Sequence, residues 1–262
     1  MRETSFHLGW KGGFWKSSIF AKKTSTKCAS LRYRSVLGAQ LYAASTAGTG
    51  ELIAAAIEAG ARRILVGAGG SATTDGGDGA IRALEAAGGL HDASLEVLCD
   101  TTVAFEDAAR VYAAQKGADE AQMERLTSRL TAQAGALPRD PRGRTMTGAA
   151  GGLAGGLWAS FGAHLIPGAA TVLGLLGFDD RLEHAESVIT GEGRLDGQSF
   201  EGKLVGQLAR RCREAGVPLH AIAGSSGIDR AEAARRGIAS VSEAGTPETI
   251  AHAAARIADP AG

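Results

Sequence analysis

The chain has 262 residues, equal numbers of acidic and basic residues, and 44% hydrophobic residues. This length and apolar content suit one large or two modest globular domains, and zero net charge gives no indication of a nucleic-acid or membrane partner. No apolar run reaches the length of a membrane span. Cys28, Cys99 and Cys212 are far apart and form no CxxC pair, so we expect a reducing, cytoplasmic setting rather than a disulfide framework or a zinc site.

The N-terminal segment differs from the rest of the chain. Residues 1–45 carry eight Lys or Arg against the single acid Glu3, and seven of the thirteen aromatic residues. Residues 1–41 show no helix or strand period, so we expect an atypical basic and aromatic segment that is disordered or unrelated to the rest. Its acid-poor composition is also that of a transit peptide, and a membrane or nucleic-acid arm is a weaker alternative.

From Thr46 onward, predicted helices and strands alternate. In chain order we expect helix 49–60, strand 62–69, helix 77–89, strand 95–100, helices 105–117 and 119–135, helix 148–162, strand 187–190, helix 201–216, strand 218–224, helix 230–237, strand 238–245 and helix 246–258. This alternation predicts an α/β architecture with a largely parallel sheet. Ligands of such sheets bind at loops that leave the carboxyl ends of strands, and the loops after Val66 and Thr190 qualify.

The first of these loops is rich in glycine. Between Gly67 and Gly79 there are six glycines, three hydroxyl residues and two acids. A backbone with so few side chains exposes many N–H groups, and such groups bind anions. We therefore expect a phosphate or carboxylate cradle here. The acid Asp75 could instead cap the helix that follows the loop.

The second loop, residues 190–203, gathers charged residues after a short strand. It contains the acids Glu192, Asp196 and Glu201 and the cations Arg194 and Lys203. Phosphoryl transfer needs carboxylates for Mg²⁺ or for a hydroxyl proton, and cations that neutralise the phosphates. The loop is therefore a candidate for that chemistry.

Four stretches, in this order, resemble the type I glycerate kinase (glycerate 2-kinase) family of bacteria. They are "GAGGSATTDGG", "CD…QKGA", "GAAGGLAGGL…FGAHLIPG" and "VITGEGRLDGQSFEGK". The resemblance runs from about Tyr42 to near the C-terminus. It implies ATP- and Mg²⁺-dependent phosphorylation of D-glycerate, normally to 2-phosphoglycerate. It also implies two α/β lobes, with residues 42–184 forming an inserted lobe and residues 185–262 the C-terminal part of a Rossmann-like lobe.

The resemblance assigns residues to the anion loop and to the site around it. It implies that ligand-binding residues are Gly69, Gly70, Ser71, Thr73, Asp75, Lys116 and Gln198. Thr74 stands where the family usually has Asn. From the residues alone, Lys116 would be a surface lysine, so its assignment depends on the resemblance.

The resemblance also carries a mechanistic hypothesis. Asp196 accepts the proton of the glycerate hydroxyl, and Glu192 and Asp100 hold Mg²⁺ directly or through water. Arg194 and Lys203 face anionic groups. For Asp100, a simple turn at the end of its strand is the alternative.

The N-terminal blocks of the family pattern do not occur in this sequence. We therefore expect a two-lobed glycerate kinase-like fold whose Rossmann-like lobe lacks its first strands. Sheet edges that those strands would cover favour pairing with another chain, such as a homo-oligomer. Two alternatives stay open beside a D-glycerate kinase: an inactive truncated member with residual ligand binding, and a kinase for another small hydroxy acid.

Overall fold

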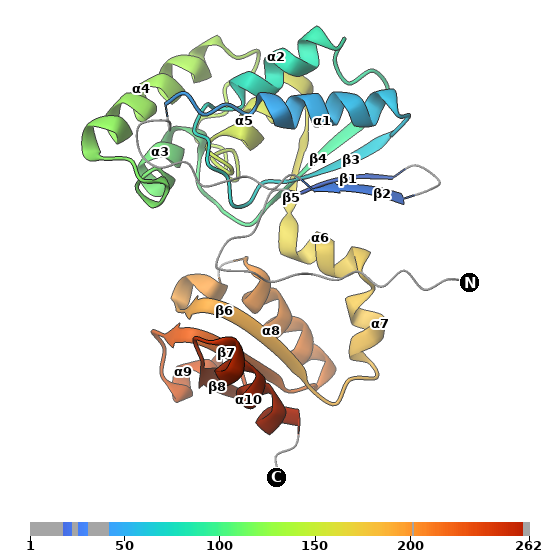
Figure 1. Cartoon of the computed structure of the whole chain (residues 1–262), viewed down its shortest axis with the longest axis vertical. Helices are drawn as coiled ribbons and strands as arrows, with labels where there is room; N and C mark the ends of the chain where they lie inside the picture. The colour runs from blue at the N-terminus through green and yellow to red at the C-terminus, as the bar shows by residue number, and fades with distance from the viewer. Residues whose placement is uncertain (1–17, 23–25, 31–41, 201, 259–262) are drawn as a thin grey trace.

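The computed structural model describes residues 18–22, 26–30, 42–200 and 202–258. These residues form two α/β lobes, one above the other in Figure 1, which are connected through a pair of helices. The upper lobe contains a five-stranded sheet and the lower lobe a three-stranded parallel sheet. The expected two-lobed α/β fold is therefore confirmed.

The sheet of the first lobe is mixed, with strand order β2-β1-β3-β4-β5. Its strands are β1 (Ser18–Lys22), β2 (Thr26–Ser30), β3 (Arg63–Gly67), β4 (Ser94–Cys99) and β5 (His164–Pro167). β3, β4 and β5 are parallel, whereas β1 is antiparallel to both β2 and β3. The carboxyl ends of the parallel strands therefore lie at one edge of the sheet.

Helices of the first lobe bury two apolar clusters. The helical elements are α1 (Ala47–Glu58), α2 (Asp78–Ala86), η2 (Phe105–Asp107), α3 (Ala108–Tyr112), η3 (Ala114–Lys116), α4 (Glu120–Ala136) and α5 (Leu153–Phe161). One cluster joins the strands β3 and β4 to α1, α2 and α5, and the other packs α3 against α4 around Phe105. α4 begins at a capping box, in which Asp119 and Gln122 bond each other's backbone N–H.

The start of α5 packs directly on the glycine-rich loop. A Cβ atom at Gly151 would lie 2.1 Å from the carbonyl oxygen of Thr73, and one at Gly156 would lie 2.2 Å from that of Gly76. Gly76 N–H also donates to the Gly151 carbonyl at 3.0 Å. No side chain fits between the two segments, so their glycines are required for this close approach.

Two helices, α6 (Gly168–Leu175) and α7 (Phe178–Leu182), link the lobes. α6 follows β5 directly and contacts β4, β5 and α8. Leu173 and Leu182, which the predicted boundary at residue 184 assigns to the first lobe, pack in the apolar cluster of the second lobe. Arg211 of α8 also pairs with Asp179 and donates to the Ala170 carbonyl.

The second lobe has the strand order β6-β7-β8. Its elements are β6 (Val188–Leu195), η4 (Gly197–Phe200), α8 (Leu204–Ala215), β7 (Leu219–Ser226), α9 (Arg230–Arg235), β8 (Ser240–Glu243) and α10 (Pro247–Ala258). Side chains of α8 and α9 pack with those of the sheet in one apolar cluster, which includes Leu195, Leu208 and Leu219.

Several local expectations differ from the structure. β6 continues through Leu195, so half of the expected loop 190–203 is strand, because its backbone pairs with β7 up to Ser226. The expected helix 105–117 is divided into η2, α3 and η3, and residues 148–152 form turns rather than helix. β5, α6 and α7 were not expected.

The prediction for residues 1–41 lies largely outside the described residues. The described part of that segment consists of β1 and β2, which pair with each other, and β1 also pairs with β3.

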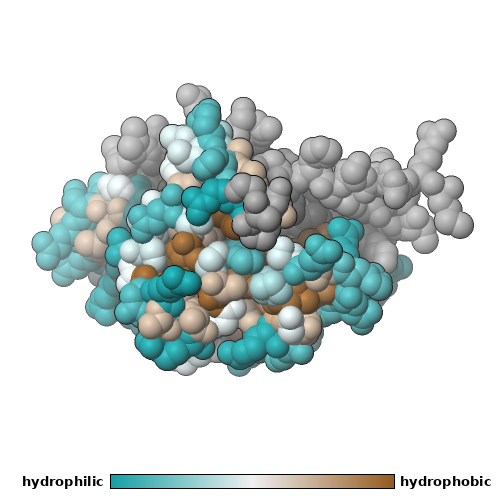
Figure 2. All heavy atoms as spheres, turned by 90° about the horizontal axis from the view of Figure 1, so that it is seen from below, coloured by the Kyte–Doolittle hydropathy of each residue, from teal (hydrophilic) through white to brown (hydrophobic). Residues whose placement is uncertain are grey.

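No helix within the described ranges is long and apolar enough to cross a membrane. Seen from below, the molecule shows small apolar areas separated by hydrophilic ones (Figure 2).

The contact between α5 and the glycine-rich loop can be tested by adding one methyl group. Gly156→Ala places a Cβ against the Gly76 carbonyl, and we expect the free energy of unfolding to fall by about 2 kcal/mol because the backbone must move. Gly135→Ala in α4, whose Cβ would meet no atom within 4 Å, is the control and should not destabilise the protein. Urea unfolding measures both, and equal effects would contradict this view of the packing.

Candidate functional site

The glycine-rich loop, residues 68–77, connects the carboxyl end of β3 to α2. Its first residue stays with the sheet, since Ala68 N–H donates to the Leu98 carbonyl at 3.0 Å. The middle of the loop, at Gly70, is exposed with a positive φ of 62°. The end of the loop is buried under α5. The loop therefore exposes Gly70 between the half-buried Gly69 and Ser71, while its base is fixed.

Lys116, at the end of η3, reaches this loop from a distant part of the sequence. Its Nζ lies 3.2 Å from Ser71 Oγ and 3.3 Å from Thr74 Oγ1, and it donates to the Thr73 carbonyl. Burial lowers the pKa of Lys116 to about 8, against the opposing effect of the nearby Asp75 carboxylate. The structure thus brings Lys116 together with Ser71 and Thr73, and a cation beside exposed backbone can attract an anion.

Asp75 is almost completely buried, with 1% of its surface exposed. Its Oδ2 accepts hydrogen bonds from the backbone N–H and the hydroxyl of Thr46, both at 2.8 Å, and from Gly79 N–H at 3.3 Å. Oδ1 accepts from Gly77 N–H at 3.3 Å. The carboxylate therefore links the starts of α1 and α2. This geometry favours the helix-capping alternative over direct contact with a ligand.

The second group of candidate residues lies at the carboxyl end of β6. Arg194 Nε and Asp196 Oδ2 are 3.4 Å apart, and both side chains are partly exposed. Asp196 Oδ1 accepts a hydrogen bond from Gln198 N–H at 3.0 Å. This bond closes a tight turn at the start of η4. Lys203 precedes α8, where its carbonyl accepts from Gln207 N–H at 3.1 Å, and its side chain has no hydrogen bond or ion pair within the described part of the chain.

Glu192 has a carboxylate oxygen without a partner. Its Oε2 is buried and accepts no hydrogen bond from the described residues. A buried carboxylate oxygen in this state costs free energy unless a ligand or cation satisfies it. Of the two acids Glu192 and Asp196, Glu192 is therefore the one that better fits a role in holding a cation.

Asp100 follows β4 and is tied to the linking helix. Its Oδ1 accepts from Ala169 N–H at 2.8 Å in the first turn of α6. This contact is more than the simple strand-end turn that the sequence suggested as an alternative. Within the described residues, Asp100 and Glu192 do not belong to any group of three or more His, Cys, Asp or Glu side chains that could hold a metal.

Three supporting residues were not recognised from the sequence. Thr46 binds Asp75 and also accepts from Ala80 N–H at 3.0 Å. Gln133 of α4 donates from Nε2 to the Gly76 carbonyl at 3.2 Å, and Glu243 of β8 accepts from Ser226 N–H at 2.9 Å. For Glu243, the "GSSG" stretch at the end of β7 was an available signal, because it places small residues at the carboxyl end of a strand.

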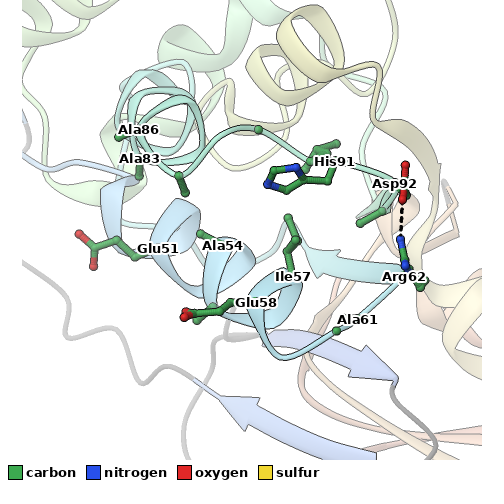
Figure 3. Close-up of a pocket in the computed structure, with 16 residues that line it drawn as sticks. Glu51, Ala54, Ile57, Glu58, Ala61, Arg62, Ala83, Ala86, His91 and Asp92 are labelled. Carbon is green, nitrogen blue, oxygen red and sulfur yellow. Dashed lines mark hydrogen bonds and ion pairs between the residues drawn. The ribbon is translucent and has the colours of Figure 1, made fainter.

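A cavity of about 820 Å³ lies away from all of these residues. It is formed by α1, α2 and the segment before β4, and the exposed Arg62–Asp92 ion pair lies beside it (Figure 3). Arg62 and Asp92 precede β3 and β4, so the cavity is at the amino ends of these strands. The candidate residues follow the carboxyl ends, and the cavity is therefore not part of the candidate site.

The structural role of Asp75 can be separated from a ligand-binding role. Asp75→Ala leaves buried N–H groups of both helix starts without an acceptor, so we expect the free energy of unfolding to fall by about 3 kcal/mol. Asp78→Ala, which removes only an exposed pair with Arg82, should cost less than about 0.5 kcal/mol. Thermal or urea unfolding measures the difference. An Asp75→Ala protein as stable as Asp78→Ala would contradict the capping role.

Comparison with known proteins finds similar chains. A family model described as "Glycerate kinase family" matches residues 33–88 and 85–260. An uncharacterized protein of Mycobacterium tuberculosis (strain CDC 1551 / Oshkosh) is 42% identical over 75% of this chain and 54% of its own. The glycerate 2-kinase of Escherichia coli (strain K12) is 36% identical over 68% of this chain and 56% of its own.

A solved structure is similar as well. A candidate glycerate kinase 2 from Salmonella typhimurium LT2 has a TM-score of 0.58 and 31% identity, covering 80% of this chain and 64% of that one. The chain spans about half the length of the two curated relatives named above. Because the family model matches most of the sequence and the Escherichia coli relative is 36% identical over 68% of this chain, the chain belongs to the glycerate kinase family.

Proposed function

We propose that this chain phosphorylates D-glycerate, using ATP and Mg²⁺, and that the product is 2-phosphoglycerate. The observation that carries the proposal is the position of Lys116 among Ser71, Thr73 and Thr74 on the glycine-rich loop. A lysine and exposed backbone N–H groups are the parts that bind phosphate or carboxylate groups. The names of the relatives agree with glycerate as the small-molecule substrate.

Glu192 and Asp100 are the residues that would hold Mg²⁺. They fit that ion because Glu192 Oε2 is buried without a partner and Asp100 uses only Oδ1 within the described residues. Mg²⁺ is commonly bound by one or two carboxylates together with substrate phosphates. When bound, Mg²⁺ supplies charge neutralisation for phosphoryl transfer.

Asp196 is proposed to accept the proton of the glycerate hydroxyl. The contact from Gln198 N–H to Oδ1 and the Arg194 guanidinium at Oδ2 orient the carboxylate, as a general base requires. Arg194 is 69% exposed and Lys203 is half-buried, so both can also reach anionic groups of the ligands.

We assign the activity to the cytoplasm, in keeping with the reduced, buried Cys99 and Cys212.

The activity is tested by ADP release from the purified full chain with MgATP, with and without D-glycerate. Glycerate-dependent release is expected, and Asp196→Asn should lower kcat by at least about a hundredfold, since general-base catalysis contributes that much. Asp180→Asn, an exposed acid of α7, is the matched control and should keep wild-type turnover.

Other results of this experiment would overturn or correct parts of the proposed function. No release from folded protein overturns the proposed activity and favours an inactive family member. Release with another small hydroxy acid but not with D-glycerate corrects the substrate. Full turnover by Asp196→Asn overturns the assignment of the base.

The pKa of Lys116, about 8, predicts a pH dependence of ligand binding. Lys116 is mainly protonated at pH 7 and mainly neutral at pH 9, so we expect the affinity for MgATP or D-glycerate to fall several-fold between these values. Lys116→Met should bind more weakly and lose this dependence. Calorimetric titration at both pH values measures the effect, and an unchanged pH dependence in Lys116→Met would contradict it.

Stability provides a control for that experiment. The pKa of Lys116 is lower in the folded chain than the ordinary 10.5, so the unfolded chain binds this proton more tightly. The contribution of Lys116 to stability therefore rises with pH between about 8 and 10.5. Weaker binding at pH 9 is then not explained by loss of the fold through this group.

A further inference from the structure

The last three residues of β7 and the glycine that follows, residues 224–227 (the GSSG segment), lie beside the candidate residues of β6. Gly227 N–H donates to the Leu195 carbonyl at 2.8 Å, immediately before Asp196 in the chain. A Cβ atom at Gly227 would lie 3.5 Å from Nη2 of Arg194 and 3.5 Å from the Cβ of Asp196. The GSSG segment forms the carboxyl end of the middle strand of the sheet, where ligands of parallel sheets bind.

The two serines of the GSSG segment, Ser225 and Ser226, differ in their hydrogen bonds. Ser226 is held on both sides, because its hydroxyl donates to the Ile228 carbonyl at 2.9 Å and its N–H donates to Glu243. Ser225 is half-buried, and its hydroxyl makes no hydrogen bond to any residue that the structure describes. The hydroxyl of Ser225 is therefore available to a ligand.

The register of the sheet places Ser225 next to Arg194. These two residues are paired between β6 and β7, and paired residues of neighbouring strands point to the same face of a sheet. Glu192 pairs with Ala223, two residues earlier, and so shares that face. The hydroxyl of Ser225 thus lies on the face that carries the guanidinium of Arg194 and the carboxylate of Glu192.

Close contacts hold the GSSG segment in this position. Glu243 Oε1 accepts from Ser226 N–H at 2.9 Å, so β8 holds the residue that follows Ser225. A Cβ at Gly224 would lie 2.7 Å from the Gly193 carbonyl, which leaves room only for glycine. These contacts hold Ser225 in place without engaging its hydroxyl.

We propose that Ser225 is a further ligand-contacting residue of this site and that Glu243 is a positioning residue for it. The Ser225 hydroxyl donates a hydrogen bond to an anionic oxygen that also pairs with Arg194. This inference rests on the proposed function, whose two ligands both carry such oxygens, in the phosphates of ATP and the carboxylate of glycerate. Hydroxyl and guanidinium together are a common donor set for either group.

The test is equilibrium binding of MgATP and of D-glycerate, measured separately on the full chain, together with steady-state kinetics. Ser225→Ala removes no hydrogen bond to the described protein, so we expect an unchanged melting temperature. We expect about tenfold weaker affinity for one ligand, a matching rise in its KM, and kcat within about twofold. The ligand that is affected identifies the source of the oxygen.

Two further variants sharpen the test. Ser242→Ala is the matched control, because Ser242 pairs with Ile222 in the same sheet and so points to the opposite face. It should bind both ligands as the wild type does. Glu243→Ala should speed hydrogen exchange of the Ser226 amide and weaken the same ligand as Ser225→Ala, whereas Glu243→Gln, which keeps an acceptor oxygen, should restore both.

The outcomes separate this inference from the proposed function. Wild-type affinity of Ser225→Ala for both ligands overturns the inference, whatever the turnover. Wild-type binding without turnover overturns the proposed activity, and the affinities then decide the role of Ser225. A wild-type chain that binds neither ligand overturns both.

Discussion

The candidate site depends on direct contact between the backbones of two glycine-rich segments. Gly151 and Gly156, at the start of α5, lie against the carbonyls of Thr73 and Gly76 with no room for a Cβ atom. The buried Asp75 carboxylate then links the same loop to the starts of α1 and α2. These contacts fix the base of the loop, so that its Gly69–Ser71 portion, in which Gly70 is exposed, keeps one shape without bulky side chains.

A fixed loop also determines where the cation lies. Lys116 reaches Ser71 and the Thr73 carbonyl from η3, and burial there lowers its pKa to about 8. The cost of partly burying an ammonium group is offset by three oxygen acceptors. The same acceptors hold Nζ beside the part of the loop where a phosphate or carboxylate would enter. In the proposed function, the side chain that holds the loop is therefore also the one that attracts the anion.

The acids of the candidate site come from both lobes. Asp100 follows β4 in the first lobe and binds the N-terminus of α6, whereas Glu192 and Asp196 belong to β6 and its turn in the second lobe. α6 and α7 also pack against α8 through Leu173, Leu182 and the Arg211 contacts. The linking helices therefore set the geometry between the two groups of acids, although they carry no candidate catalytic residue themselves.

The sequence by itself determined the α/β class, the family and the positions of the two candidate loops, because strand-and-helix periodicity and the spacing of glycines and acids are local. It did not determine that residues 191–195 are strand, since that depends on pairing with β7. It could not decide between cap and ligand for Asp75, whose partner Thr46 is 29 residues away. Lys116 and Ser225 acquired their positions only in the folded chain, because their neighbours are distant in sequence and meet through packing and register.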